Sequence, residues 1–215
     1  MILGIASIII GYLLGSIPTA YIITKMRKGI DIRTVDIGNV GGGSVLRQVG
    51  IWEGVLVLVV DMAKGAATIY IAQALGVSML WVFGAGFAAV LGHSYPVYIG
   101  FRGGQGVATI LGIFWFLTPI AVAILFGIVG IILLVIRRKF PRVLFIIISI
   151  LTPLLPVFIW IFYRSEIIVY YSLVFILFLL FKNRRRLKEV VAVLKFRRGP
   201  EEAEITSRDI SPDDN

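Results

Sequence analysis

Long apolar stretches, separated by short polar ones, set the pattern of the chain from its first residues to Phe181. Several of them approach the length of about 20 residues that a helix needs to cross a bilayer. The pattern predicts an all-α, polytopic membrane protein with about seven transmembrane helices and glycine-rich cytoplasmic re-entrant loops. The expected spans are Ile2–Ile23, Trp52–Leu75, Met79–Ile99, Val107–Leu117, Pro119–Ile136, Val143–Tyr163 and Ile167–Phe181.

The apolar stretch from Val107 to Ile136 admits two interpretations because only Thr118-Pro119 indicates a turn in it. One long helix kinked at the proline is the alternative to two spans. Basic clusters follow the first, fifth and seventh spans: Lys25, Arg27, Lys28 and Arg33; Arg137, Arg138, Lys139 and Arg142; Lys182, Arg184, Arg185, Arg186 and Lys188. If the stretch from Val107 to Ile136 forms two spans, all three basic clusters fall on the same side of the membrane. The cytoplasmic bias of basic residues then predicts an outside N-terminus and a cytoplasmic C-terminus.

Composition supports a membrane protein and excludes several kinds of site. Hydrophobic residues make up 59% of the chain and charged residues 15%, whereas a soluble domain carries roughly 25% charged residues. The absence of cysteine excludes disulfides and thiolate metal sites, and a single histidine argues against a metal cluster. Cytoplasmic basic loops account for the net charge of +9, so we expect no nucleic-acid partner.

The two ends of the chain need separate interpretation. The first apolar run lacks a basic leader and is long, so we expect a retained span rather than a signal peptide. Residues 188–215 change from basic to acidic, which is typical of a soluble and partly disordered segment. We therefore predict a transmembrane domain over residues 1–187 and a cytoplasmic tail over residues 188–215.

The first of three polar stretches is glycine-rich and reads DIRTVDIGNVGGGSVLRQVG, from Asp31 to Gly50. Its glycines permit positive φ and let backbone N–H groups point at one anion; they are Gly38, Gly41, Gly42 and Gly43. Asn39 and Ser44 add neutral hydrogen bonds, and Arg47 offers a bidentate fork that suits phosphate. The alternative interpretation is a flexible loop between spans.

The second polar stretch, GHSYPVYIGFRGGQGVAT, contains the only histidine, His93. A turn of Gly103, Gly104, Gln105 and Gly106 comes directly before the apolar run that starts at Val107. Such a turn puts free N–H groups at a helix N-terminus, where the dipole favours an anion. Arg102 adds positive charge beside it. A histidine satisfied at the membrane interface is the alternative role for His93.

The third polar stretch, DMAKG, lies inside the second predicted span. Asp61 and Lys64 share a helix face at a spacing of three residues and can neutralise each other. Ionisable residues inside a membrane are costly and suggest function, but here we expect a structural ion pair that docks the span. Backbone amides of the two glycine-rich stretches, together with Arg47 and Arg102, predict a phosphate site at the cytoplasmic surface.

These motifs resemble those of the bacterial acyl-phosphate-dependent glycerol-3-phosphate acyltransferases, over nearly the whole chain to about Leu187. GNVGGGSVLRQVG is similar to the family's first motif, GSGNxGATNVLR, and DMAKG to its D-x-x-K-G. GHSYPVYIGFRGGQGVATILG is similar to its second motif, GHxxPxxxxFxGGKGVATxxG. The resemblance implies a seven-span enzyme of the bacterial inner (plasma) membrane with a cytoplasmic active site.

The resemblance also implies the reaction: transfer of an acyl group from acyl phosphate to the 1-hydroxyl of glycerol-3-phosphate, giving lysophosphatidic acid in phospholipid synthesis. It implies no metal or other cofactor, a monomer in the lipid bilayer, and a substrate phosphate that can itself take the hydroxyl proton. With the residue-level reasoning, it predicts His93 as the catalytic residue. The predicted substrate-binding residues are Asn39, Gly41, Gly42, Ser44, Arg47, Arg102, Gly103, Gly104, Gln105, Gly106, Arg142 and Asn183.

Several motif positions depart from the family pattern. Ile37 replaces a serine, Gly43-Ser44 a Thr-Asn pair, Gln105 a lysine, Arg142 a serine, and Asn183 and Arg186 a histidine and an asparagine. Losing a lysine–phosphate contact costs about 1.5–3 kcal/mol if nothing compensates. The alternative function is therefore a catalytically altered or inactive paralogue that binds a different phosphorylated acceptor or an enzyme partner. A transporter is a third option, but the polar residues gather on one side rather than at the midplane.

Overall fold

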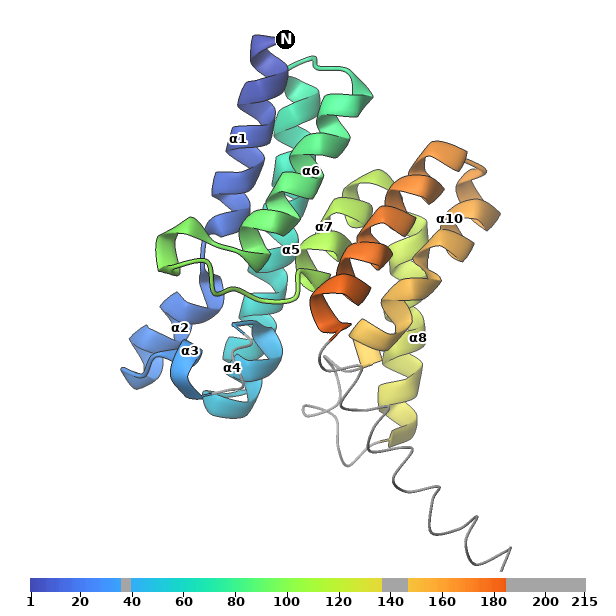
Figure 1. Cartoon of the computed structure of the whole chain (residues 1–215). Coiled ribbons are helices and arrows are strands. Elements are labelled where there is room, and N and C mark those ends of the chain that lie inside the picture. Colours follow the sequence, from blue (N-terminus) through green and yellow to red (C-terminus); the bar gives the residue numbers. More distant parts are fainter. Residues whose placement is uncertain (36–39, 137–146, 185–215) are drawn as a thin grey trace, which may run out of the picture. The chain divides into compact units, whose positions relative to one another are not determined.

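A computed structural model of the chain describes residues 1–35, 40–136 and 147–184 (Figure 1). Within those residues every regular element is a helix, which confirms the all-α prediction. The elements are α1 (Ile2–Ser16), α2 (Thr19–Lys28), α3 (Ile32–Val35), α4 (Gly42–Gln48), α5 (Ile51–Ala74), α6 (Met79–Ser94), the 3-10 turn η1 (Val97–Ile99), α7 (Val107–Leu117), α8 (Pro119–Ile136), η2 (Thr152–Leu154), α10 (Leu155–Tyr163) and the helix Glu166–Arg184.

Each of the seven predicted spans contains a helix. In the described part of the chain, four helices are long and apolar enough to cross a membrane: Ile2–Lys28, Ile51–Ala74, Met79–Ile99 and Glu166–Arg184. Shorter apolar helices occupy Val107–Leu117, Pro119–Val135 and Ile147–Tyr163. The number of spans therefore stays a prediction.

The chain reverses at Thr118-Pro119 instead of continuing as one kinked helix. α7 ends at Leu117 and α8 begins at Pro119, and the two helices pack against each other. Proline is well suited to the first turn of a helix, where its missing N–H has no partner to lose. The alternative of a single long helix is wrong (Figure 1).

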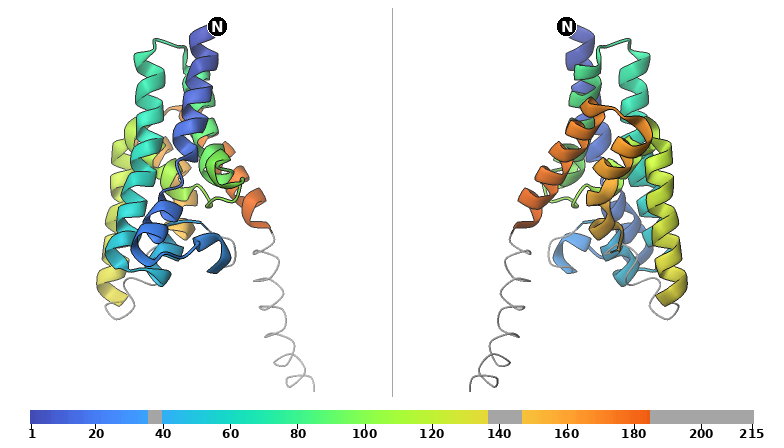
Figure 2. Two further views of the ribbon diagram at one scale, coloured as in Figure 1. Left: turned by 90° about the vertical axis from the view of Figure 1, so that its left-hand side faces the viewer. Right: turned by 90° about the vertical axis from the view of Figure 1, so that its right-hand side faces the viewer.

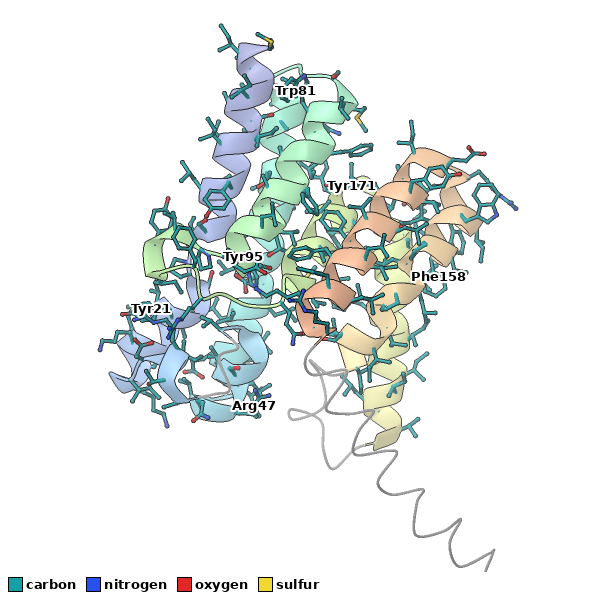
Figure 3. All side chains as sticks on the ribbon, viewed as in Figure 1. Tyr21, Arg47, Trp81, Tyr95, Phe158 and Tyr171 are labelled. Atoms are coloured by element: carbon teal, nitrogen blue, oxygen red, sulfur yellow. The ribbon has the colours of Figure 1, made fainter. Side chains whose placement is uncertain are left out.

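Small residues bring α1 and α6 into close contact along their length, with α5 beside them (Figures 1 and 2). Gly11 and Gly15 of α1 lie directly against the backbone of Ala85 and Ala89 of α6. In a membrane, helices associate by such close backbone packing because lipid gives no hydrophobic drive between them. Trp81 covers Gly4 near the other end of the pair (Figure 3).

A second close contact joins α5 to α7. Gly65 of α5 lies against the backbone of Thr109, and Gly112 of α7 lies against the backbone of Met62. This contact places the D-x-x-K-G segment beside the start of α7. The two close contacts therefore bring the second and third polar stretches to the same part of the molecule.

The chain forms two compact units, Met1–Leu179 and Leu180–Asn215. In the first unit, Tyr171 donates to the carbonyl of Phe83 at 2.9 Å and stacks on that ring. This bond ties the helix that starts at Glu166 to α6. The predicted domain boundary at residue 187 stays a prediction, because residues 185–215 lie outside the described part of the chain.

Candidate active site

A break in the first apolar helix opens the site. α1 ends at Ser16 and α2 begins at Thr19, so Ile17 and Pro18 interrupt the helix. Proline has no N–H and cannot continue the helical ladder at this point. The carbonyl of Ile17, at the break, accepts a hydrogen bond from Lys64 Nζ at 3.2 Å.

Asp61 lies at the centre of a buried polar cluster next to this break. Its Oδ1 is 2.8 Å from Lys64 Nζ, accepts a hydrogen bond from Thr19 Oγ1 at 3.1 Å, and lies 3.7 Å from His93 Nδ1. The predicted ion pair is confirmed. However, it does more than dock one span, because its partners come from α2, α5 and α6.

A pocket lies against this cluster at the α2 end of the helices. Its polar wall consists of Thr19, Asp61, Lys64 and His93. The remaining lining residues are Ile17, Pro18, Ala20, Val40, Pro96, Ile99 and Gly103. A hydrogen-bonding wall that contains the Lys64–Asp61 ion pair faces an apolar wall, which suits a ligand with a polar and an apolar part.

The two glycine-rich stretches meet at this pocket, as the sequence predicts. A Cβ built on Gly104 would overlap His93 Nε2 and come within 2.8 Å of the carbonyl oxygen of Val40. Only glycine lets the backbone lie this close to the imidazole ring. The contact joins the segment before α7 to the segment before α4.

The turn before α7 differs in one respect from the prediction of free N–H groups. The N–H of Gly104 donates to the carbonyl of His93 at 3.1 Å, so it is already used. Gly106 has φ of 91° and caps α7, whose first-turn N–H groups start at Val107. A left-handed conformation explains why a glycine is required there.

The glycines before Arg47 have a different role from the predicted one. Gly42 and Gly43 belong to the helix α4, and Gly41 is extended with φ of −151°, so these three do not use the positive φ that glycine permits. Gly42 is buried, and its carbonyl lies 3.1 Å from a Cβ built on Gly54 of α5. Gly54 therefore lets α4 pack closely on α5.

The other predicted binding residues are distributed as follows. Arg47 lies exposed on α4 (Figure 3), outside the pocket lining, and donates to Ser44 Oγ at 3.3 Å. Arg102 is exposed and Gln105 is half-buried in the segment before α7. Asn183 lies in the last turn of the helix Glu166–Arg184, in the second unit. The predictions for Asn39 and Arg142 fall outside the described residues.

Comparison with known proteins identifies the family. A model described as glycerol-3-phosphate acyltransferase matches residues 5–193. The glycerol-3-phosphate acyltransferase of Shouchella clausii is 36% identical over 202 residues, 93% of this chain and 98% of that protein. The chain belongs to the glycerol-3-phosphate acyltransferase family.

Other similar proteins belong to the same family. The glycerol-3-phosphate acyltransferase of Geobacter metallireducens is 50% identical over 113 residues, a match that spans 53% of this chain and only 58% of that relative. Crystal structures of PlsY (YgiH), an integral membrane glycerol 3-phosphate acyltransferase, superpose with a TM-score of 0.75 for the glycerol 3-phosphate form and 0.73 for the lysphosphatidic acid form. The first is 31% identical and covers 88% of this chain and 92% of that one. This acyltransferase-family chain is accordingly a membrane protein.

Arg33 forms a contact, not predicted from the sequence, that holds one wall of the pocket. Arg33 Nη1 donates to the carbonyl of Ile99 at 2.9 Å, while its Nη2 lies 2.6 Å from Asp31 Oδ2. The Arg33 guanidinium hydrogen-bonds the Asp31 carboxyl and lowers its pKa from 3.8 to about 2. The guanidinium also lies over the ring of Tyr21, 5.1 Å from its centroid.

Sequence reasoning also missed Thr19 as a member of the site. No motif singles out a threonine that follows a proline inside an apolar run. The signal that was available is the intramembrane Asp61 itself, because a buried carboxylate requires partners and those partners must come from neighbouring helices.

Proposed function

We propose that this chain transfers an acyl group from acyl phosphate to the 1-hydroxyl of glycerol-3-phosphate, giving lysophosphatidic acid. The observation that carries the proposal is the pocket where both glycine-rich stretches meet a buried Lys64 and His93. Family membership supports it, as do the PlsY structures with glycerol 3-phosphate and lysphosphatidic acid. Acyl phosphate as the donor rests on the resemblance of the motifs.

In the proposed reaction the hydroxyl oxygen attacks the acyl carbonyl carbon. An ester C–O bond forms, the C–O bond to the phosphoryl group breaks, and inorganic phosphate leaves with the hydroxyl proton. Both substrates carry phosphate, so the site must stabilise negative charge before and after the transfer. Lys64 and the first-turn N–H groups of α7 are the candidate donors near the pocket, and Arg47, which is exposed outside the pocket lining, is a candidate donor predicted from the sequence.

We also propose that the pocket faces the cytoplasm and that the protein lies in a bacterial plasma membrane. The pocket is at the α2 end of the first unit, and the N-terminus lies at the opposite end of α1 (Figure 1). Lys25, Arg27 and Lys28 are all exposed in α2. Basic residues that flank spans favour the cytoplasmic side. A water-soluble phosphorylated acceptor is available on that side.

Purified protein, incubated with acyl phosphate and glycerol-3-phosphate, tests the function. We expect lysophosphatidic acid and inorganic phosphate in equal amounts. Arg47→Ala should lower kcat/KM roughly tenfold to a hundredfold, since a hydrogen bond to a charged group contributes about 1.5–3 kcal/mol. Arg27→Ala is the matched control, because Arg27 is also exposed but pairs with Glu53 at 3.4 Å.

Two outcomes would contradict the proposal. The first is the absence of lysophosphatidic acid above the level of a protein-free blank, with glycerol-3-phosphate as acceptor. The second is transfer to another phosphorylated acceptor with none to glycerol-3-phosphate, which would support the altered specificity suggested by Gln105.

A further inference from the structure

One oxygen atom of the buried cluster is shared by three helices. Asp61 Oδ1 contacts Lys64 of its own helix α5, Thr19 of α2 and His93 of α6. Asp61 is 2% exposed, and both Lys64 and His93 are 7% exposed. Because water does not hydrate a carboxylate at this depth, the three neighbours must compensate its negative charge. Its partners therefore fix where the carboxylate lies.

The carboxylate faces a defined side of the imidazole ring. His93 Nδ1 lies 3.7 Å from Asp61 Oδ1, which is an electrostatic contact slightly longer than a hydrogen bond. Nε2, on the other side of the ring, lies against the backbone of Gly104. A carboxylate beside Nδ1 favours a proton on that nitrogen and leaves Nε2 as the acceptor. The ring would then present Nε2 to the glycine turn that leads into α7.

The same cluster also supports the turn. The carbonyl of His93 accepts the N–H of Gly104, so the backbone and the ring of one residue both contact this glycine. Lys64 extends the cluster to the helix break through the carbonyl of Ile17. A shift of the carboxylate would therefore reach the pocket by way of the His93 ring.

We propose that Asp61 is a positioning residue of this acyltransferase: it fixes the orientation and tautomer of His93, while Lys64 and Thr19 hold the carboxylate in place. The inference rests on the proposed function for its catalytic consequence. Its structural part, the orientation and tautomer of the His93 ring, does not depend on the activity. The two parts can therefore be tested separately.

The chain's single histidine makes the structural part directly measurable. Protein labelled with ¹⁵N-histidine and purified through a histidine-free tag gives one imidazole signal pair. On the alkaline side of the titration, where the ring is neutral, we expect the wild type to carry its proton on Nδ1. Asp61→Asn should move the population toward Nε2–H. Glu53→Gln, which removes a carboxylate from the same helix, should leave the spectrum unchanged.

Kinetics tests the catalytic part. Asp61→Asn should lower kcat roughly tenfold to a hundredfold with little change in KM, because a His93 ring that has lost its fixed orientation disturbs the geometry of the reacting groups. Thr19→Val removes one donor to Asp61 and should shift the spectrum and kcat in the same direction by a smaller amount. If Asp61→Asn does not fold, Thr19→Val replaces it in both measurements, the imidazole spectrum and kcat.

The outcomes separate the two ideas. Unchanged tautomer populations in a folded Asp61→Asn variant, or in Thr19→Val if Asp61→Asn does not fold, overturn the positioning role, whatever the activity. A wild type without acyl transfer contradicts the proposed function, and the spectra still decide whether Asp61 positions His93. A changed tautomer with kcat within twofold of wild type overturns the catalytic consequence.

Discussion

The Asp31–Arg33 pair shows how a single surface interaction shapes the site. Arg33 contacts Asp31 with one terminal nitrogen and the pocket-lining Ile99 with the other. Removing the carboxylate leaves the guanidinium free to move, so the wall at Ile99 loses its tether. The pair thus connects charge outside the membrane-spanning helices to the geometry of the pocket.

Low pH should weaken the Asp31–Arg33 pair in a defined pH window. The pKa of Asp31 falls from 3.8 to about 2 in the folded protein, so its stabilising contribution is complete above about pH 4 and is lost as the pH falls toward 2. Thermal unfolding in detergent should show Asp31→Asn less stable by about 1 kcal/mol at neutral pH. The difference between variant and wild type should shrink as the pH drops through the window. A constant difference would contradict the assignment.

Gly104 is the residue at which the two glycine-rich stretches touch. We expect Gly104→Ala to lower kcat/KM roughly a hundredfold, because the new methyl group would displace the His93 ring and a shift of about 1 Å can have that effect. Gly127→Ala is the matched control, since nothing lies within 4 Å of a Cβ built on Gly127. Equal activities of the two variants would contradict the contact.

Residue-level prediction succeeded where the chemistry is local and failed where it depends on the fold. The pairing of Asp61 with Lys64 follows from their spacing on one helix. The bond from Thr19 to Asp61 joins residues 42 positions apart, and no spacing rule reveals it. Arg47 was predicted from its chemistry, but its place on the exposed side of α4 depends on how that helix packs.

At the scale of elements, the contact between α1 and α6 determines where His93 lies. Gly15 sits against the backbone of Ala89, one turn before His93. Gly15→Ala would push the two helices apart and should destabilise the protein by about 1–3 kcal/mol. Thermal unfolding in detergent measures the effect, with Gly130→Ala in α8 as the control, because a Cβ there meets open space. A melting temperature unchanged from that of the control would contradict close packing at Gly15.

Apolar length and turn residues made most helices predictable from the sequence. Two features of the helices could not be predicted in this way. The break at Pro18 falls inside a continuous apolar run, so hydropathy gives no sign of it. α4 contains two glycines, which disfavour a helix by roughly 1 kcal/mol each in isolation. Packing on α5 offsets that preference, because Gly54 lets Leu46 and the carbonyl of Gly42 approach α5 closely.

At the scale of the whole molecule, the orientation in the membrane can be tested cleanly because the chain has no cysteine. Thr34 follows the basic α2, Ser78 lies between α5 and α6, and both are exposed. A membrane-impermeant maleimide should label Ser78→Cys in intact cells and Thr34→Cys only after permeabilisation, because basic flanks stay inside. The reverse pattern would place the pocket on the outer side and contradict the cytoplasmic assignment.

The spacing of Asp61 and Lys64 also has a consequence for biogenesis. A lone charge at the centre of a span raises the cost of insertion by about 2.5–3.5 kcal/mol on the translocon scale. Here the opposite charges lie three residues apart on one helix, 2.8 Å from each other. A nascent span that carries its own counter-ion meets the lipid nearly neutral, before α6 has been synthesised. Lys64→Met should therefore lower the yield of inserted protein even in cells that do not need its activity.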